Sequence, residues 1–228
     1  MDNLLSSIKI ELNPHLFQKD PESSELGRNI LSQSLLMIDE MGLECFTFGK
    51  LAKALGTTES SIYRYFESKH KLLLYFYNWY WSWIDLQLAF HTHNLSSPDS
   101  KLKRAIEVIC KPDAEDKSIS ALNFEQLINI VISESSKAYL TKEVDTENKF
   151  GLFLTFKKVS RRLADIMIEV DPEFTYANTL ASTSIVGILH QQYFALHMPS
   201  LSDIQSDKDE LSNVFYQIIS KNLKNQNG

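Results

Sequence analysis

The sequence is poor in glycine, proline and cysteine, and each shortage excludes a class of protein. Seven Gly and six Pro among 228 residues are few for a loop-rich β protein and favour long regular elements. The two cysteines, Cys45 and Cys110, lie far apart and in no metal-binding or redox spacing. We therefore expect reduced thiols rather than a disulfide framework.

Recognisable catalytic motifs are also missing. The sequence contains no Gly-rich phosphate loop, no G-x-S-x-G motif and no Cys–His arrangement that suggests a nucleophile. His91 and His93 are two positions apart, which places them on different faces of a helix, and no further metal ligand lies near them. We predict that the chain is not an enzyme and that it needs no cofactor or metal.

Long hydrophobic runs are absent as well. Even the apolar stretch 72–90 is interrupted by Asn78, Ser82 and Asp85, so no window of about 18 apolar residues could span a bilayer. The N-terminus has an early Asp and lacks a basic segment followed by a long apolar core, which argues against a secretory signal. We expect a soluble, cytoplasmic protein with no membrane partner.

Positive charge is scarce overall but concentrated in one segment. The chain carries 23 Lys and Arg against 29 Asp and Glu, a net charge of −6. Residues 47–75 hold five Lys or Arg and two Glu, a net of +3, so the remaining residues carry −9. A local basic patch on an acidic chain is compatible with a small DNA-reading head on a body that avoids DNA.

Helical spacing of apolar residues predicts an all-α fold of about nine helices. An irregular N-terminal arm over residues 1–22 precedes a head over 23–70 with helices at about 23–41, 48–55 and 59–66. The remaining residues, 71–228, form a second helical domain. Its expected helices cover about 69–90, 99–111, 119–138, 146–169, 173–196 and 207–224.

Two short helices in the head form a predicted helix-turn-helix. Thr47 and Thr58 stand where N-caps are needed, and Gly56 lies in the turn between the two helices. Ile62 and Phe66 are four residues apart and should point to the core. In this motif the second helix enters the major groove, so its early polar residues should face base edges.

The residues expected to contact DNA are short hydroxyls, tyrosines and cations around that second helix. They are Thr47, Lys50, Thr58, Ser60, Ser61, Tyr63, Arg64, Tyr65 and Lys69. Lys69 follows the N-cap residue Ser68, where a cation opposes the helix dipole. We interpret this unfavourable placement as a contact between Lys69 and a DNA phosphate.

The segments LAKALGTTESSIYRYF and SKHKLL, with Gly42 and Thr47 before them, resemble the DNA-binding domain of the tetracycline-repressor (TetR) family. The resemblance covers about Ile30 to Leu74. It implies a homodimeric transcription factor, most often a repressor, that binds a double-stranded DNA operator. It further implies C-terminal helices that form the dimer and bind a small hydrophobic effector. Glu59 and Tyr65 depart from the family, which often has Lys and His there.

Helix 69–90 carries aromatic residues on every face, so some must pack in the core and some could line a ligand pocket. Both roles stay open. The candidate effector-binding residues combine two of these aromatics with polar groups elsewhere: Trp79, Trp83, Asn123, Gln126, His190 and Gln191.

Two stripes near the C-terminus suggest a dimer interface. One consists of small residues in helix 173–196, namely Ala177, Ala181, Ser184 and Gly187. The other is apolar and lies in helix 207–224: Leu211, Val214, Phe215 and Ile218. The two helices could form a four-helix bundle with a second copy, or simply pack inside one chain.

An all-α small-molecule-binding protein or enzyme with a vestigial helix-turn-helix is the alternative function.

Overall fold

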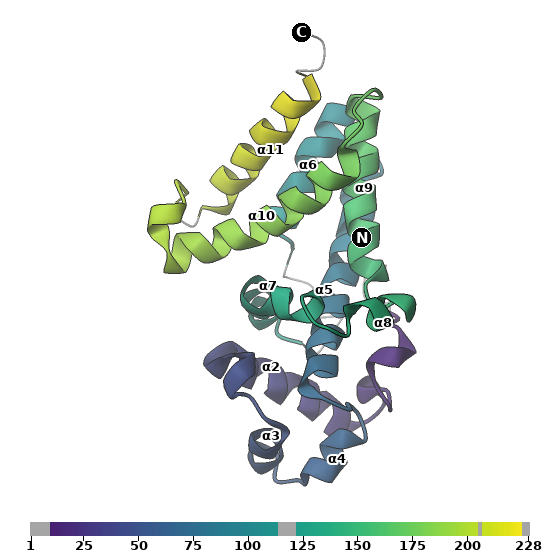
Figure 1. The fold of residues 1–228 in the computed structure, drawn as a ribbon, viewed down its shortest axis with the longest axis vertical. Coiled ribbons are helices and arrows are strands. Elements are labelled where there is room, and N and C mark those ends of the chain that lie inside the picture. Colours follow the sequence, from purple (N-terminus) through teal and green to yellow (C-terminus); the bar gives the residue numbers. More distant parts are fainter. Residues whose placement is uncertain (1–9, 114–121, 205–206, 225–228) are drawn as a thin grey trace. The chain divides into compact units, whose positions relative to one another are not determined.

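The computed structural model describes residues 10–113, 122–204 and 207–224, and they form an all-α fold, as predicted (Figure 1). Ten α-helices and three short 3-10 helices occur in this part of the chain. The chain divides into two compact units. Unit 1 comprises Met1–Tyr80 and Ala114–Leu154, and unit 2 comprises Trp81–Asp113 and Thr155–Gly228.

Unit 1 contains the predicted head and part of the predicted second domain. Its elements are η1 (Pro14–Leu16), η2 (Pro21–Ser23), α2 (Glu25–Cys45), α3 (Phe48–Ala54), α4 (Glu59–Tyr63), the first half of α5 (Lys69–Thr92), α7 (Phe124–Tyr139) and α8 (Val144–Lys149). Unit 2 contains the second half of α5, α6 (Pro98–Cys110), α9 (Leu154–Val170), α10 (Ala177–His197), η3 (Pro199–Leu201) and α11 (Lys208–Lys224).

Several predicted helices have different bounds in the structure; for example, the helix expected over 59–66 is α4, which ends at Tyr63. The single helix expected over 146–169 is two helices, α8 and α9, because Gly151 has a φ of 78° and breaks the helical path. The helix expected over 119–138 is α7, which starts at Phe124 after the N-cap Asn123; positions 119–121 lie outside the described residues.

Helix α2 organises unit 1. Ser24 caps its start by accepting a hydrogen bond from the Gly27 N–H at 3.2 Å, and its buried stripe includes Ile30 and Leu35. The helix is interrupted at Gly42, whose φ of 74° and ψ of 158° are essentially accessible only to glycine. The Leu43 N–H that follows donates to Glu134 Oε1 of α7 at 3.0 Å, so α7 supports the break.

The aromatic side chains of α5 are mostly core residues. Tyr75 and Tyr80 are fully buried in unit 1, and Trp81 is fully buried in unit 2. In unit 1 the ring of Tyr75 lies edge-on against Phe66 at 5.5 Å, and in unit 2 Trp81 packs on Phe156 at 4.9 Å. Packing therefore accounts for most of the aromatics of this helix, whereas Phe90 near its end is 54% exposed.

In unit 2, helix α10 packs against α6 and α11. A Cβ atom on Gly187 would lie 3.2 Å from two ring atoms of Phe215, so the absence of a side chain lets α11 approach closely. The small residues Ala177, Ala181 and Ser184 are buried in the same unit. Gly187 of the small-residue stripe therefore packs against Phe215 of the same chain.

The two cysteines differ in exposure. Cys45 lies exposed at the end of α2, whereas Cys110 is buried at the end of α6, and burial raises the pKa of its thiol. Of the helices that the structure describes, none is long and apolar enough to cross a membrane.

Candidate nucleic-acid interface

The helix-turn-helix is formed by α3 and α4, each with the expected N-cap. Thr47 Oγ1 accepts the Lys50 N–H at 3.2 Å, and Thr58 Oγ1 accepts the Ser61 N–H at 3.3 Å. Between the helices Gly56 adopts a φ of 61°, which suits a residue without a side chain. The N-cap hydrogen bonds of Thr47 and Thr58 thus define where α3 and α4 begin.

One face of α4 is polar and exposed. On the opposite face, Ile62 is fully buried in the interior of unit 1. Ser60 and Arg64 are exposed. Tyr63 is 46% exposed and rests edge-on against Phe48 with ring centroids 5.1 Å apart. Hydroxyl and guanidinium groups on this face could contact base edges and phosphates.

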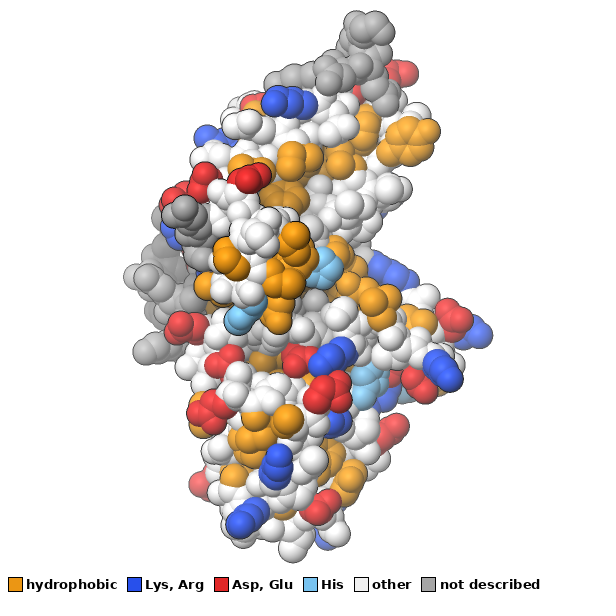
Figure 2. Space-filling view, turned by 60° about the vertical axis from the view of Figure 1, so that its left-hand side comes forward, with side chains coloured by type: hydrophobic (Ala, Val, Ile, Leu, Met, Phe, Trp, Pro, Cys, Tyr) orange, Lys and Arg blue, Asp and Glu red, His pale blue; other side chains and the backbone are white. Residues whose placement is uncertain are grey.

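The end of unit 1 that carries α3 and α4 bears both positive and negative side chains. In Figure 2, Lys and Arg side chains stand beside acidic ones on the end that carries α3 and α4. Glu59 at the start of α4 lies over the first turn of α3, because a Cβ on Gly49 would be 2.8 Å from its Oε1 atom. A carboxylate there is favoured by the positive end of α3 but would repel a nearby phosphate.

The side chain of Lys69 has a partner within the protein. Its Nζ donates to the carbonyl oxygens of Leu43 at 2.8 Å and Phe46 at 3.3 Å, with Glu44 also at 3.3 Å. These carbonyls follow the break of α2 at Gly42, and each gives the ammonium a hydrogen-bond acceptor. The unfavourable position of Lys69 at the start of α5 is therefore offset by these three contacts.

The next two residues of the sequence, His70 and Lys71, contact one buried carboxylate. His70 Nε2 lies 3.0 Å from Glu147 Oε1, and Lys71 Nζ lies 3.3 Å from the same atom. The Glu147 side chain is only 5% exposed, so the positive start of α5 compensates a charge that would be costly alone. The segment from Lys69 to Lys71 connects α5 to α2 and α8.

The expected DNA contact of Tyr65 requires a correction. This side chain is 4% exposed, and its hydroxyl lies 2.8 Å from Ser24 Oγ and 3.3 Å from Lys19 Nζ. Its backbone carbonyl accepts the Gln18 N–H at 2.8 Å. The chain turns after Tyr63, so Tyr65 faces the N-terminal segment instead of the exposed face of α4.

Lys50 is exposed, but its Nζ donates to the carbonyl oxygen of Cys45 at 2.8 Å. The hydroxyl groups of Thr58 and Ser61 lie 3.0 Å from each other. These groups are partly used in holding the motif together. Ser60, Tyr63 and Arg64 are the predicted contacts whose side chains are most open to a ligand.

The expected effector-binding residues do not gather in one unit. Trp79, Asn123 and Gln126 belong to unit 1, and Trp83, His190 and Gln191 belong to unit 2. Asn123 caps α7 through its Oδ1 atom, which accepts the Glu125 N–H at 3.1 Å. Trp83 is buried, and its Nε1 donates to the Asp113 carbonyl oxygen at 3.0 Å. Both residues therefore have structural roles.

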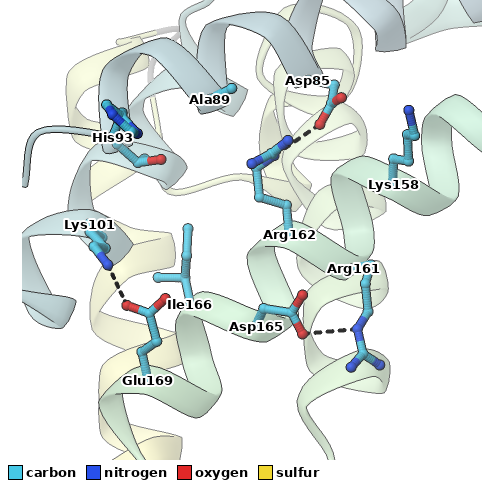
Figure 3. Close-up of a pocket in the computed structure, with 11 residues that line it drawn as sticks. Asp85, Ala89, His93, Lys101, Lys158, Arg161, Arg162, Asp165, Ile166 and Glu169 are labelled. Carbon is cyan, nitrogen blue, oxygen red and sulfur yellow. Dashed lines mark hydrogen bonds and ion pairs between the residues drawn. The ribbon is translucent and has the colours of Figure 1, made fainter.

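Unit 2 contains a pocket of about 540 Å³ that sequence reasoning missed (Figure 3). It lies among α5, α6 and α9, and none of the six expected effector-binding residues lines it. The sequence signal that could have revealed it is the run of four cations in residues 157–162, of which Lys158, Arg161 and Arg162 line the pocket.

The expected dimer residues divide into two groups. Leu211 and Phe215 are buried in unit 2 with the small residues of α10. Val214 is half-buried, and Ile218 is 45% exposed on α11. Only this second group leaves apolar surface for a partner.

The segment that forms the helix-turn-helix matches a known protein family model. The family model described as "Bacterial regulatory proteins, tetR family" matches residues 30–76, which span most of α2, all of α3 and α4, and the start of α5. Comparison with curated protein sequences finds no match.

Similar solved structures cover most of the chain. AibR, solved with isovaleryl coenzyme A and operator DNA, shares 16% identity with a TM-score of 0.58 over 84% of this chain and 96% of that one. The fatty acid degradation regulator FadR from Bacillus halodurans shares 18% with a TM-score of 0.59 over 87% and 94%. PfmR from Thermus thermophilus, a TetR family transcriptional regulator, shares 16% with a TM-score of 0.59 over 86% and 98%. At these identities the likeness establishes a shared fold.

Proposed function

We propose that this chain, whose residues 30–76 match the model of the tetR family of bacterial regulatory proteins, is a homodimeric repressor that a small-molecule effector releases from operator DNA. The general part of this proposal, a DNA-binding transcriptional regulator, rests on the family match. Repression, release by an effector and the dimer are the finer parts of the proposal.

The observation that supports DNA binding most directly is the exposed polar face of α4. Ser60, Tyr63 and Arg64 are exposed on a helix whose start is fixed by Thr58 and whose inner face is anchored by Ile62. A short helix presented in this way can enter a major groove and offer hydrogen-bond donors to base edges.

Exposed apolar residues near the end of unit 2 support a dimer. Figure 2 shows hydrophobic side chains gathered over the end of α10 and the turn that follows it. The large apolar residues exposed here and on α11 are Leu196, Met198, Leu201 and Ile218. A second copy would remove this surface from water. It would also supply the second recognition helix that a two-fold operator needs, about 34–36 Å from the first.

The effector part of the proposal has two supports. Unit 2 holds a pocket of about 540 Å³, within the usual range for small-molecule sites. AibR, whose fold is shared, was solved with both isovaleryl coenzyme A and operator DNA. Release would follow if the effector binds more tightly to a conformation that fits the operator poorly.

DNA binding is tested with the chain's own upstream DNA in a fluorescence anisotropy titration at several salt concentrations. Arg64→Ala should weaken binding and reduce the slope of log K against log salt by about 1, because it removes one cation near the phosphates. Lys221→Ala is the matched control, since it removes an exposed cation from α11 in unit 2.

Failure of the wild-type chain to bind this DNA at low salt would count against the regulator. An equal loss in both variants would show that binding does not use α4. In that case turnover or ligand binding without DNA would support the alternative, an all-α small-molecule-binding protein or enzyme with a vestigial helix-turn-helix.

A further inference from the structure

The first half of α9 carries an unusual concentration of positive charge. Between Leu154 and Ala164 there are four Lys or Arg and no Asp or Glu. The pairs Lys157–Arg161 and Lys158–Arg162 are four residues apart, a spacing at which like charges destabilise a helix. Lys157 and Lys158 also stand at the end of the first turn, where the dipole disfavours cations. Arg161 has a partner on the same helix, Asp165, but no acidic residue lies three or four positions from Lys158.

Three of these cations line the pocket of unit 2. Arg162 Nε reaches Asp85 Oδ1 of α5 at 2.9 Å, and Arg161 pairs with Asp165 on its own helix at 2.9 Å (Figure 3). Lys158 lines the pocket too, and no ion pair joins it to another residue in the described part of the chain. This end of the pocket thus has three cations against two carboxylates.

At the other end of the pocket, positive and negative charges are equal in number. Lys101 of α6 pairs with Glu169 of α9 at 2.6 Å, as Figure 3 shows. Between the two ends, Ala89 of α5 and Ile166 of α9 contribute apolar lining. The excess positive charge therefore lies at the Lys158 end, next to an apolar centre.

We propose that this pocket binds an amphipathic organic anion. Its carboxylate or phosphate group lies at Lys158 and Arg162, and its apolar part covers Ala89 and Ile166. The acidic group supplies a countercharge for Lys158, and it competes with Asp85 for Arg162. Binding itself is independent of DNA, whereas identification of this anion as the effector rests on the proposed function.

The test uses octanoate as the probe and isothermal titration calorimetry as the readout, at physiological ionic strength. Octanoate should bind the wild-type chain and raise its melting temperature, because a ligand specific to the native state stabilises it. Lys158→Glu should weaken binding at least tenfold, and Lys158→Arg should restore it. Lys103→Glu is the matched control, an exposed lysine of α6 in the same unit that does not line the pocket.

Asp85→Asn gives a second, opposite test. This substitution removes the carboxylate that competes for Arg162, so octanoate should bind at least threefold more tightly. The uncharged probe 1-octanol should show no difference between Lys158→Glu and the wild type. No octanoate binding, an equal loss in Lys158→Glu and Lys103→Glu, or weaker binding in Asp85→Asn would overturn the proposal.

The effector role is measured separately by adding octanoate to the complex of the chain with its upstream DNA. Release in the wild type but not in Lys158→Glu supports an anionic effector at this pocket. Octanoate binding without DNA release leaves the anion site standing and removes its role as the effector site. A chain that binds octanoate but no DNA contradicts the proposed function and not the pocket.

Discussion

The Lys69 ammonium donates to the carbonyl oxygen of Leu43 at 2.8 Å and so joins the start of α5 to the end of α2. Lys69→Met keeps most of the side-chain volume but removes the ammonium donor, because a thioether has no hydrogen to donate to the carbonyls of Leu43, Glu44 and Phe46. We expect the free energy of unfolding to fall by about 1–3 kcal/mol. Urea denaturation followed by circular dichroism measures this change.

Lys53→Met is the control for Lys69→Met, because Lys53 is exposed on α3. It should change the free energy of unfolding by less than about 0.5 kcal/mol. If both variants lose the same stability, the contacts of Lys69 with α2 contribute nothing. If Lys69→Met is as stable as the wild type but loses DNA affinity, the phosphate contact expected from the sequence is its main role.

Gly42→Ala should destabilise unit 1 by about 1–3 kcal/mol, because a φ of 74° with a ψ of 158° is essentially restricted to glycine. Gly49→Ala is the matched control within α3. There the new Cβ comes close only to the flexible end of the Glu59 side chain, with Thr47 Oγ1 at an ordinary contact distance of 3.9 Å, and alanine favours the helix. Thermal melting of the two variants should therefore diverge. A Gly42→Ala protein as stable as wild type would show that the break in α2 is not needed.

Tyr63 and Tyr65 should respond in opposite ways to loss of the hydroxyl group. Tyr65→Phe removes the contact with Ser24 and should cost about 0.5–1.5 kcal/mol of stability. Tyr63→Phe should leave stability unchanged and weaken operator binding, since its hydroxyl lies on the exposed face of α4. Denaturation and anisotropy on both variants test this. A direct role of Tyr65 at DNA would appear as lost affinity without lost stability.

The ion pair between Glu44 and Lys137 should make stability depend on pH. Hydrogen bonding and charge from Lys137 hold the pKa of the Glu44 carboxyl below its usual value. A lowered pKa in the folded state contributes stability above the unfolded pKa of about 4.3, and this contribution is lost as the pH falls through the folded value. Wild type should exceed Glu44→Gln in urea midpoint at about pH 6, and the difference should close at about pH 3. A difference that persists at the lower pH would point to a cause other than charge.

Glu59→Gln should strengthen operator binding. The substitution removes a negative charge from the start of α4 and from the side of α3 that carries Gly49. Less repulsion of phosphates should raise affinity by about threefold or more at low salt, with a smaller gain at high salt. Anisotropy titrations at two salt concentrations measure this. Weaker binding would contradict this repulsion and show that the negative charge of Glu59 favours the complex.

The head was predictable where its determinants lie within a few residues of one another. Thr47 and Thr58 cap helices by contacts three positions away, and Gly56 acts through its own backbone. Lys69 was different, because its partner Leu43 lies 26 positions earlier. A helix start with an unfavourable cation indicates a distant partner without revealing whether that partner is a phosphate or a carbonyl group.

Contacts between residues far apart in the sequence were not predictable, either in the head or in unit 2. The burial of Tyr65 depends on Ser24, 41 positions away, and the role of Arg162 depends on Asp85, 77 positions away. Small residues such as Gly187 suit an internal helix contact and a subunit contact equally well, so spacing could not distinguish them. In unit 2, Phe215 occupies the space that Gly187 leaves.

The contrast between the two cysteines has a practical consequence. Cys110 is buried with a raised thiol pKa, whereas Cys45 is exposed at the end of α2, directly before the helix-turn-helix. A maleimide spin label should therefore attach to one position per chain without any engineered residue. In a dimer, the distance between the two labels would report the separation of the two heads with and without ligand.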